Sequence, residues 1–132
     1  MIVDASALIS VVTGAPGYER IADLLADSAR SSIGAPTLLE TGMVLDGRAG
    51  ARGRTALGRV TAEARLRVLP FTEEHERIAL DAFSRFGKGR HEAALNFGDC
   101  CCYATAVVAG EPLLCVGENF ARTDLELIPL DR

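Results

Sequence analysis

Short apolar runs alternate with stretches of helical spacing along the first part of the chain. Residues 1–3 are apolar and are followed by Asp4, a pattern that predicts a short buried strand ending at an acid. Residues 5–12 read ASALISVV and predict a helix, which the glycine- and proline-containing stretch at 14–17 ends. A second helix is expected to run to about Arg30, and its apolar stripe consists of Ile21, Leu24 and Leu25.

The middle of the chain predicts a second short strand followed by two helices. Residues 31–34 suit a strand, and Pro36 fits the first turn of a helix over 37–50. A further helix is predicted over 50–65. Glu40 lies one turn into the first of these helices, whose candidate core positions are Leu38, Leu39, Met43 and Leu45.

The last part of the chain repeats the alternation of strand and helix. Thr72 is a candidate N-cap for one helix, and Gly98-Asp99 opens another that ends at Gly110. Strands are predicted at 67–71, 112–117 and 125–130. Because short buried strands alternate with helices, we expect an α/β fold with a parallel or mostly parallel sheet and helices on both faces.

The composition fits one compact domain over residues 1–132. Hydrophobic residues make up 48% of the chain and charged residues 24%, which is enough for a core and excludes a disordered segment. No apolar run reaches the roughly 20 residues that cross a bilayer, and the start lacks the pattern of a signal peptide. We therefore expect a cytoplasmic protein whose cysteines are thiols.

Three consecutive cysteines in LNFGDCCCYATA raise the question of a metal–thiolate site. Successive residues of a helix point about 100° apart, so the sulfurs of Cys100, Cys101 and Cys102 cannot converge on one ion. The chain has one other cysteine, Cys115, and no Cys-x-x-Cys pair to complete a tetrahedral set. We interpret these cysteines as small buried side chains and expect Asp99 to carry the chemistry of this stretch.

Carboxylates follow the predicted strands and open the predicted helices. Asp4 ends the first strand and Glu118 follows the strand at 112–117, so both belong to one edge of a parallel sheet. Asp99 and Glu40 lie near the starts of their helices, where helix dipoles favour anionic side chains. Carboxylates that meet repel one another unless a divalent cation neutralises them, and oxygen ligands without histidine favour Mg²⁺ or Mn²⁺. The sequence therefore predicts a metal site.

Four segments carry a resemblance to a known family: MIVDASALIS at the start, LLE ending at Glu40, LNFGDCCCYATA, and PLLCVGENFARTDLELI. Together they resemble the PIN-domain ribonucleases, specifically the VapC-type toxins of bacterial toxin–antitoxin pairs. The block from Leu95 to Asp124 is the most specific part. The resemblance implies a three-layer α/β/α fold with a short central sheet, and an endoribonuclease that depends on Mg²⁺, for which Mn²⁺ can substitute.

The resemblance also implies roles for individual residues. The family's acids after the first strand, in the third helix and at the GD helix start match Asp4, Glu40 and Asp99, of which Asp4 and Asp99 are the expected metal ligands. Glu118 stands near a fourth catalytic acid, where an aspartate is common, and Ser6 matches a hydroxyl beside the metal. A metal-activated water would attack phosphorus in line while the ribose 3′ oxygen leaves.

Basic residues offer a surface for RNA despite a net charge of −4, which argues against a general polyanion binder. Arginines crowd one segment, at Arg48, Arg52, Arg54, Arg59, Arg65 and Arg67. Lys88 and Arg90 add to this surface if they face the same groove. The candidate RNA contacts are Ser6, Arg48, Arg52, Arg54, Lys88 and Arg90, and the alternative for each arginine is a solvated helix face.

Apolar residues of the first two helices predict a partner surface: Leu8, Val11, Val12, Ile21, Leu24 and Leu25. The resemblance implies a cognate VapB-type antitoxin in such a groove, and a homodimer. The alternative is that these residues only fill the core. His75 and His91 are expected at the surface, and no Ser-His-acid arrangement is visible, which disfavours covalent hydrolysis.

Two other classes of magnesium-dependent protein also have a strand that ends in aspartate. Receiver modules need paired acids before that aspartate, and haloacid-dehalogenase phosphatases need a second aspartate where Ser6 stands, so neither pattern is met. The remaining alternative is a catalytically weak or inactive PIN-like module that binds RNA or protein, because the fourth acid is altered. RNA cleavage that requires magnesium and is abolished by a chelator distinguishes the two.

Overall fold

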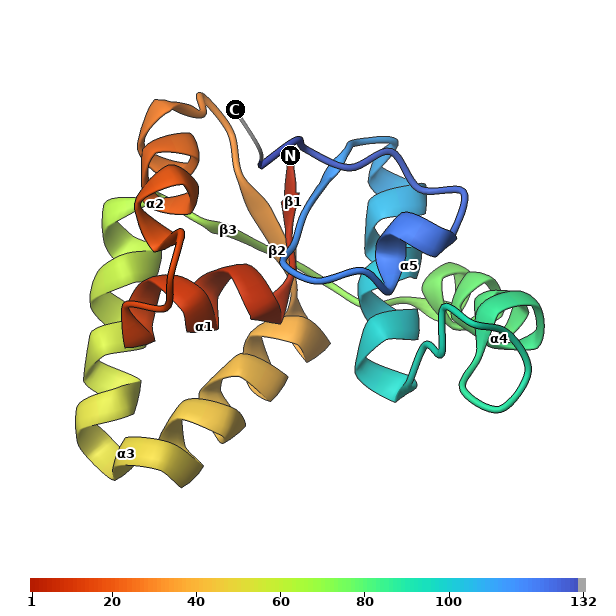
Figure 1. The fold of residues 1–132 in the computed structure, drawn as a ribbon, viewed down its shortest axis with the longest axis horizontal. Coiled ribbons are helices and arrows are strands. Elements are labelled where there is room, and N and C mark those ends of the chain that lie inside the picture. The colour runs from red at the N-terminus through yellow and green to blue at the C-terminus, as the bar shows by residue number, and fades with distance from the viewer. Residues whose placement is uncertain (131–132) are drawn as a thin grey trace.

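Four short parallel strands form one central sheet in the computed structural model, which describes residues 1–130 (Figure 1). The strands are β1 (Ile2–Val3), β2 (Ser32–Gly34), β3 (Arg67–Leu69) and β4 (Leu113–Leu114), in the order β3-β2-β1-β4. Ile2 is in register with Ser32 on one side and Leu113 on the other. Because all the pairs are parallel, the carboxyl ends of the strands meet at one edge, as the sequence predicts.

Helices cover both faces of this sheet, which confirms the expected three-layer arrangement (Figure 1). One layer consists of α1 (Ala5–Thr13), α2 (Tyr18–Asp27) and α3 (Ala35–Glu63). The other consists of α4 (Glu73–Phe86), α5 (Phe97–Ala109) and the short 3₁₀ helix η1 (Phe120–Arg122). No helix within the described range is long and apolar enough to cross a membrane.

The sheet separates two cores because successive side chains of a strand point to opposite faces. Ile2 and Leu113 belong to the core under α4 and α5, whereas Val3 and Leu114 belong to the core under α1, α2 and α3. All four side chains are fully buried. Even two-residue strands therefore contribute to both layers.

The long helix α3 has two arms that meet at a sharp bend at Gly50. This residue has φ 58° and ψ −139°, a conformation that favours glycine. The sequence predicts that one helix ends and another begins at this residue, which is confirmed. The bend turns the second arm back toward the sheet (Figure 1), so that Leu45 and Leu57 from the two arms share one core.

Some side chains lie elsewhere than the sequence pattern predicts. Leu39 and Met43 were expected in the core but are 65% and 66% exposed, because Thr37, Thr41 and Leu45 form the buried stripe of the first arm. His75 was expected at the surface but is buried. Its Nδ1 accepts a hydrogen bond from the Thr72 amide at 3.0 Å, and its ring stacks on Phe71.

Two predicted boundaries were also wrong. The second helix ends at Asp27, three residues before Arg30. The expected strand at 125–130 is reduced to an isolated parallel bridge between Leu127 and Leu113. This segment nevertheless joins the sheet edge, because Glu126 and Ile128 each make one backbone hydrogen bond with Leu113.

Candidate functional site

Asp4 connects β1 to α1 at the carboxyl edge of the sheet. Its side chain caps α1, because Oδ2 accepts hydrogen bonds from the Ser6 amide at 3.0 Å and the Ser6 hydroxyl at 2.6 Å. The Ser6 hydroxyl in turn accepts a hydrogen bond from the Val116 amide at 2.9 Å, on the loop after β4. Asp4 is therefore buried and held in one orientation by two neighbouring strand ends.

Asp99 lies in the first turn of α5, as predicted, but the helix is capped one turn earlier by Asn96. The Asn96 Oδ1 accepts from the Asp99 amide at 2.9 Å, and the Asp99 Oδ2 accepts from the Asn96 amide at 3.1 Å. The helix therefore starts at Phe97, one residue before the predicted Gly98, and this reciprocal cap is not among the predicted features. The spacing of Asn96 and Asp99, an Asx residue and an acid three positions later, was the signal.

Glu40 reaches the same place from the first arm of α3. A β-carbon on Gly98 would lie only 2.6 Å from the Glu40 Oε1, so the carboxylate packs directly on the backbone of the first turn of α5. Any larger residue at this position would displace Glu40 or the helix. Gly98 therefore explains how two elements far apart in the sequence bring their acids together.

The three carboxylates interact through their charges. The pKa of Glu40 is raised by burial and by the charges of Asp4 and Asp99. The pKa of Asp99 is raised by burial and by Asp4, although the Asn96 hydrogen bond opposes this shift. No salt bridge pairs any of the three with an arginine, lysine or histidine within residues 1–130. The edge of the sheet therefore carries negative charge without a protein counter-ion.

The chemistry of this site suits a hard divalent cation, because carboxylate oxygens are its only charged donors. As they stand, however, no three His, Cys, Asp or Glu side chains in the described part of the chain converge on an ion position. Glu118 is exposed on the loop after β4, and the interactions that shift Glu40 and Asp99 do not include it. The structure brings together three of the four predicted acids.

The cysteines that follow Asp99 are buried free thiols, as expected. Burial, followed by the charge of Asp99, raises the pKa of Cys100 to about 11. Burial, followed by the charges of Asp4 and Asp99, raises the pKa of Cys115 to about 12. Because metals bind the thiolate, these shifts disfavour a thiolate site and keep the sulfurs in the role of small apolar groups.

The basic candidate RNA-binding residues are exposed, whereas Ser6 is half-buried, and the basic residues do not form one surface. Arg48, Arg52 and Arg54 lie around the bend of α3, and Arg54 pairs with Asp46 at 3.4 Å. Lys88 and Arg90 lie on the loop between α4 and α5. Figure 1 places that bend and that loop toward opposite ends of the molecule, so the condition that they face one groove is not met.

The apolar residues of α1 and α2 are mostly core residues. Leu8, Ile21 and Leu25 are buried, whereas Val11, Val12 and Leu24 are only partly buried against the same core. For the first three, the alternative that they only fill the core is correct.

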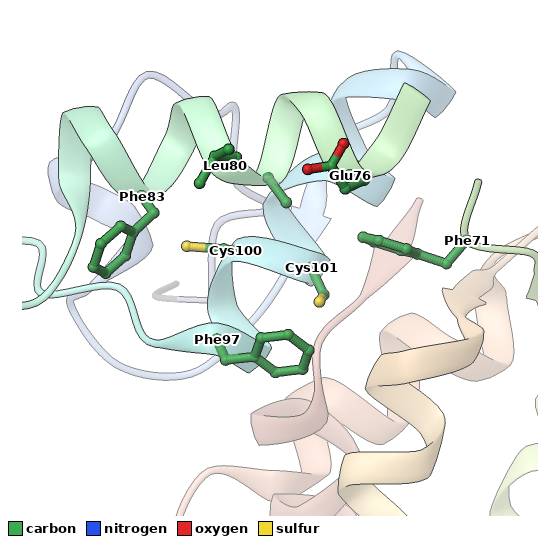
Figure 2. Close-up of a pocket in the computed structure, with 8 residues that line it drawn as sticks. Phe71, Glu76, Leu80, Phe83, Phe97, Cys100 and Cys101 are labelled. Carbon is green, nitrogen blue, oxygen red and sulfur yellow. The ribbon is translucent and has the colours of Figure 1, made fainter. Parts of the chain in front are cut away.

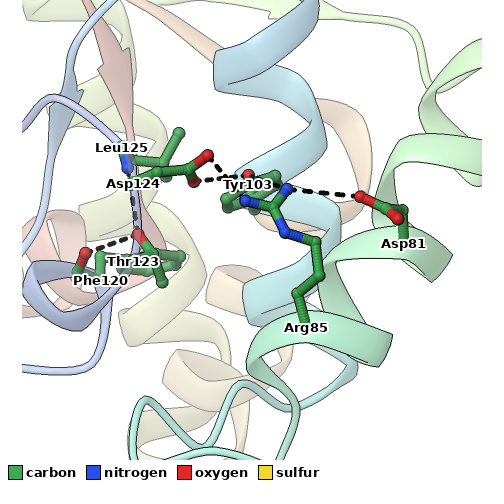
Figure 3. A network of polar contacts seen from close by, with 7 residues as sticks. All are labelled: Asp81, Arg85, Tyr103, Phe120, Thr123, Asp124 and Leu125. Atoms are coloured by element: carbon green, nitrogen blue, oxygen red, sulfur yellow. Dashed lines mark hydrogen bonds and ion pairs between the residues drawn. The ribbon is translucent and has the colours of Figure 1, made fainter.

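A polar network absent from the sequence analysis joins α4, α5 and the segment after η1 (Figure 3). The Asp124 Oδ1 accepts from the Tyr103 hydroxyl at 2.6 Å, and its Oδ2 accepts from the Arg85 guanidinium at 2.9 Å. Arg85 also contacts Asp81 at 3.4 Å. The hydrogen bonds from Tyr103 and Arg85 lower the pKa of Asp124. Burial, followed by the hydrogen bond to Asp124, raises the pKa of Tyr103 to about 12, although Arg85 opposes this shift.

Comparison with known proteins places this architecture in a family. Residues 1–126 match the model of the PIN domain. The chain is 47% identical over 127 residues to the ribonuclease VapC36 of Mycobacterium tuberculosis, covering 96% of this chain and 91% of that protein. It is 36% identical to the ribonuclease VapC of Mycolicibacterium smegmatis, covering 97% of this chain and 99% of that protein.

Solved structures share the fold. The VapC20 toxin of Mycobacterium tuberculosis, described as cleaving the sarcin-ricin loop, superposes with a TM-score of 0.78 at 20% identity over 96% of this chain and 97% of that chain. VapBC2 of Rickettsia felis, solved with a DNA fragment from its promoter, superposes with a TM-score of 0.77 at 15% identity over 96% of each chain.

Proposed function

Because the chain belongs to the PIN domain family, among the VapC-type ribonucleases, we propose that it is the toxin of a type II toxin–antitoxin pair. Its activity is that of an endoribonuclease that depends on Mg²⁺ or Mn²⁺. The observation that supports this most directly is the group of three mutually repelling carboxylates, Asp4, Glu40 and Asp99, without a protein counter-ion in the described residues. Such a group is costly to fold unless a bound cation offsets its charge.

Asp4 and Asp99 would hold the cation, with Glu40 beside them. A bound Mg²⁺ ion supplies neutralisation of phosphate charge and a lower pKa for a coordinated water. The Asp4 Oδ2 is fixed by the Ser6 amide and hydroxyl, and the Asp99 Oδ2 is fixed by the Asn96 amide. The other carboxylate oxygen of each residue is the one that would face a ligand.

The reaction is hydrolysis of an RNA phosphodiester. A water oxygen attacks phosphorus, the bond from phosphorus to the ribose 3′ oxygen breaks, and the proton of the water must be taken up. Glu40 suits that task because burial and the charges of Asp4 and Asp99 raise its pKa, which favours uptake of a proton. Ser6 acts as a positioning residue, since its hydroxyl orients Asp4 and ties the loop after β4 to the site.

The activity is tested with purified protein on single-stranded and structured RNAs. We expect cleavage in Mg²⁺ or Mn²⁺ that a chelator abolishes and that Asp99→Asn loses while circular dichroism stays unchanged. Val107→Ala is the matched control, because this exposed side chain lies on the same helix at the end remote from the acids. Cleavage that persists in chelator, or in folded Asp99→Asn, would refute the assignment.

A second candidate function is a catalytically inactive PIN-like module that binds RNA or protein. The observation that favours it is the separation of Glu118 from the three acids, together with the absence of a converged ligand set among residues 1–130. RNA binding without cleavage at any Mg²⁺ or Mn²⁺ concentration would favour this alternative.

A VapB-type antitoxin is the proposed protein partner. Support comes from the names of the relatives, which are VapC ribonucleases, and from the partly buried apolar residues Val11, Val12 and Leu24 on α1 and α2. We expect expression of the chain alone to arrest growth, and co-expression with a VapB-type antitoxin to restore growth and yield a stable complex. Harmless solo expression of active enzyme would contradict this.

We also propose that the chain forms a homodimer. Leu39 and Met43 lie one turn apart on the first arm of α3 and are among the most exposed large apolar residues of the described chain. Light scattering after gel filtration should give twice the mass of the 14.0 kDa chain, and Met43→Glu should shift it toward the monomer.

A further inference from the structure

An apolar cavity opens between α4 and α5 (Figure 2). Its volume is about 360 Å³, within the range of about 300–1,000 Å³ that is typical of small-molecule sites. The main lining side chains are Phe71, Leu80, Phe83, Phe97, Cys100 and Cys101. Figure 2 shows the aromatic rings arranged around the two sulfurs, with Glu76 as the charged group on the wall.

Phe97 is unusual among these residues because it is 82% exposed. It is the first residue of α5 and belongs to neither core. A phenyl ring left in water at the mouth of an apolar cavity is a ready platform for a flat aromatic ligand.

The cavity and the acid site both include residues of the first turn of α5. Phe97 directly precedes Gly98, whose backbone touches the Glu40 carboxylate. Cys100 and Cys101, the two residues that follow Asp99 on α5, form part of the wall. A phosphodiester held at the acids would therefore have its neighbouring nucleotide beside the cavity.

The positive charge of Arg90 lies next to Phe83, one of the residues that line the cavity. The Arg90 guanidinium lies over the Phe83 ring, 5.1 Å from its centroid. Arg90 is exposed and makes no ion pair within the part of the chain that is described. An apolar aromatic cavity with an unpaired cation at its edge matches the chemistry of a nucleotide, which has a flat base and an anionic phosphate.

We propose that this cavity holds one unpaired base of the RNA substrate, adjacent to the cleaved bond, stacked on Phe97, with Arg90 contacting a flanking phosphate. This inference rests on the proposed ribonuclease function. Because the lining offers few hydrogen-bonding groups, the cavity selects a base that is free to leave its stack rather than a particular base. The preferred substrate is therefore a single-stranded segment or loop.

The first experiment removes the base from the substrate. After the cleaved bond is mapped, matched RNAs carry an abasic ribose on its 5′ or its 3′ side. Wild-type enzyme should cleave one of the two about tenfold or more slowly than the intact RNA, through KM. Phe97→Ala should cleave that abasic RNA and the intact RNA at equal rates, whereas Phe97→Trp should restore the difference. The proposal is overturned if loss of the base slows cleavage by Phe97→Ala as much as it slows cleavage by the wild-type enzyme.

The second experiment measures binding without catalysis. In chelator, 2-aminopurine at the same position should be quenched by wild-type protein and by Val107→Ala, but not by Phe97→Ala. Quenching without cleavage would refute the enzyme while keeping the cavity as a base site. Cleavage without quenching would refute the cavity alone. If Phe97→Ala instead converts a dimer to a monomer, the cavity is a contact between two copies and the proposal is wrong.

Discussion

Two groups of carboxylates in this protein have opposite electrostatic environments. At the carboxyl edge of the sheet, Asp99 and Glu40 have raised pKa values because burial and neighbouring acids oppose their charge. At the end of the chain, Asp124 has a lowered pKa because Tyr103 and Arg85 donate hydrogen bonds to it. The first group lacks a counter-ion in the described residues, and the second has one.

This difference is the one expected if Asp124 stabilises the fold and the three acids bind a ligand, as proposed above. Asp124 ties the segment after η1 to α4 and α5, and its partners satisfy both of its oxygens (Figure 3). Asp4, Glu40 and Asp99 repel one another, so the fold gains nothing from their charge until a cation arrives. We therefore expect unsatisfied charge, rather than burial, to distinguish the proposed metal-binding acids from the structural one.

The largest expected effect is on catalysis, and it separates the two groups. Asp99→Asn keeps the Asn96 cap but removes a charge. Substituting a residue that only orients a metal ligand typically costs about 10–100-fold in activity, and the rate of cleavage should fall by more than this in Asp99→Asn. Asp124→Asn should leave cleavage within a few-fold, because Asp124 does not contact the three acids. Initial rates on one RNA, with circular dichroism as the folding control, check both.

The opposite result would show that the two groups of acids have the reverse roles. If Asp124→Asn abolishes cleavage in a folded protein while Asp99→Asn does not, the network at the end of the chain is the catalytic one.

The second expected effect is on stability and depends on metal. Mn²⁺ at about 100 times its dissociation constant should raise the free energy of unfolding by about 2.7 kcal/mol, because it binds only the folded site. Asp99→Asn should lose most of this gain, and Asp124→Asn should retain it. Urea unfolding with and without Mn²⁺ measures the difference. An equal gain in both variants would mean that the ion binds elsewhere.

The acid edge was largely predictable from sequence, because its signals are local. A strand that ends in aspartate, a glycine before Asp99 and a proline before Glu40 each mark the start of a helix, and parallel strands bring such starts to one edge. The position of Glu118 was less predictable, because it lies on the loop after β4, whose conformation no local sequence pattern indicates.

The Asp124 network had no local signal. Its members Arg85, Tyr103 and Asp124 come from three segments and meet only through tertiary packing. The same reason explains the errors at Leu39 and Met43, since helical spacing reveals an apolar stripe but not which of two stripes faces the sheet. It also explains His75, whose burial depends on the stacked ring of Phe71.

The third expected effect concerns stability alone. Tyr103→Phe removes the hydrogen bond to Asp124 and should cost about 1 kcal/mol, less than the usual value for a charged partner because the Asp124 side chain is 55% exposed. Arg85→Gln should cost less, since its ion pair is exposed. Neither variant should change the Mn²⁺ dependence of cleavage. Thermal unfolding of both variants, followed by a Mn²⁺ titration, tests this.

The smallest expected effect is the dependence of stability on pH, which has opposite signs in the two groups. For Asp99 and Glu40 the folded pKa is above the ordinary values of 3.8 and 4.5, so the folded state holds protons that the unfolded state releases. Metal-free protein should therefore lose stability as pH rises from these ordinary pKa values through the raised folded ones, and Asp99→Asn should reduce the loss. Asp124 has the reverse shift, so its contribution is present above its ordinary value of 3.8 and is lost as pH falls through its lowered value. Urea unfolding from pH 3 to 8, in chelator, should show the descending limb shrink in Asp99→Asn and the acid limb shrink in Asp124→Asn. If both substitutions alter the same limb, the two groups do not differ in the way that their surroundings indicate.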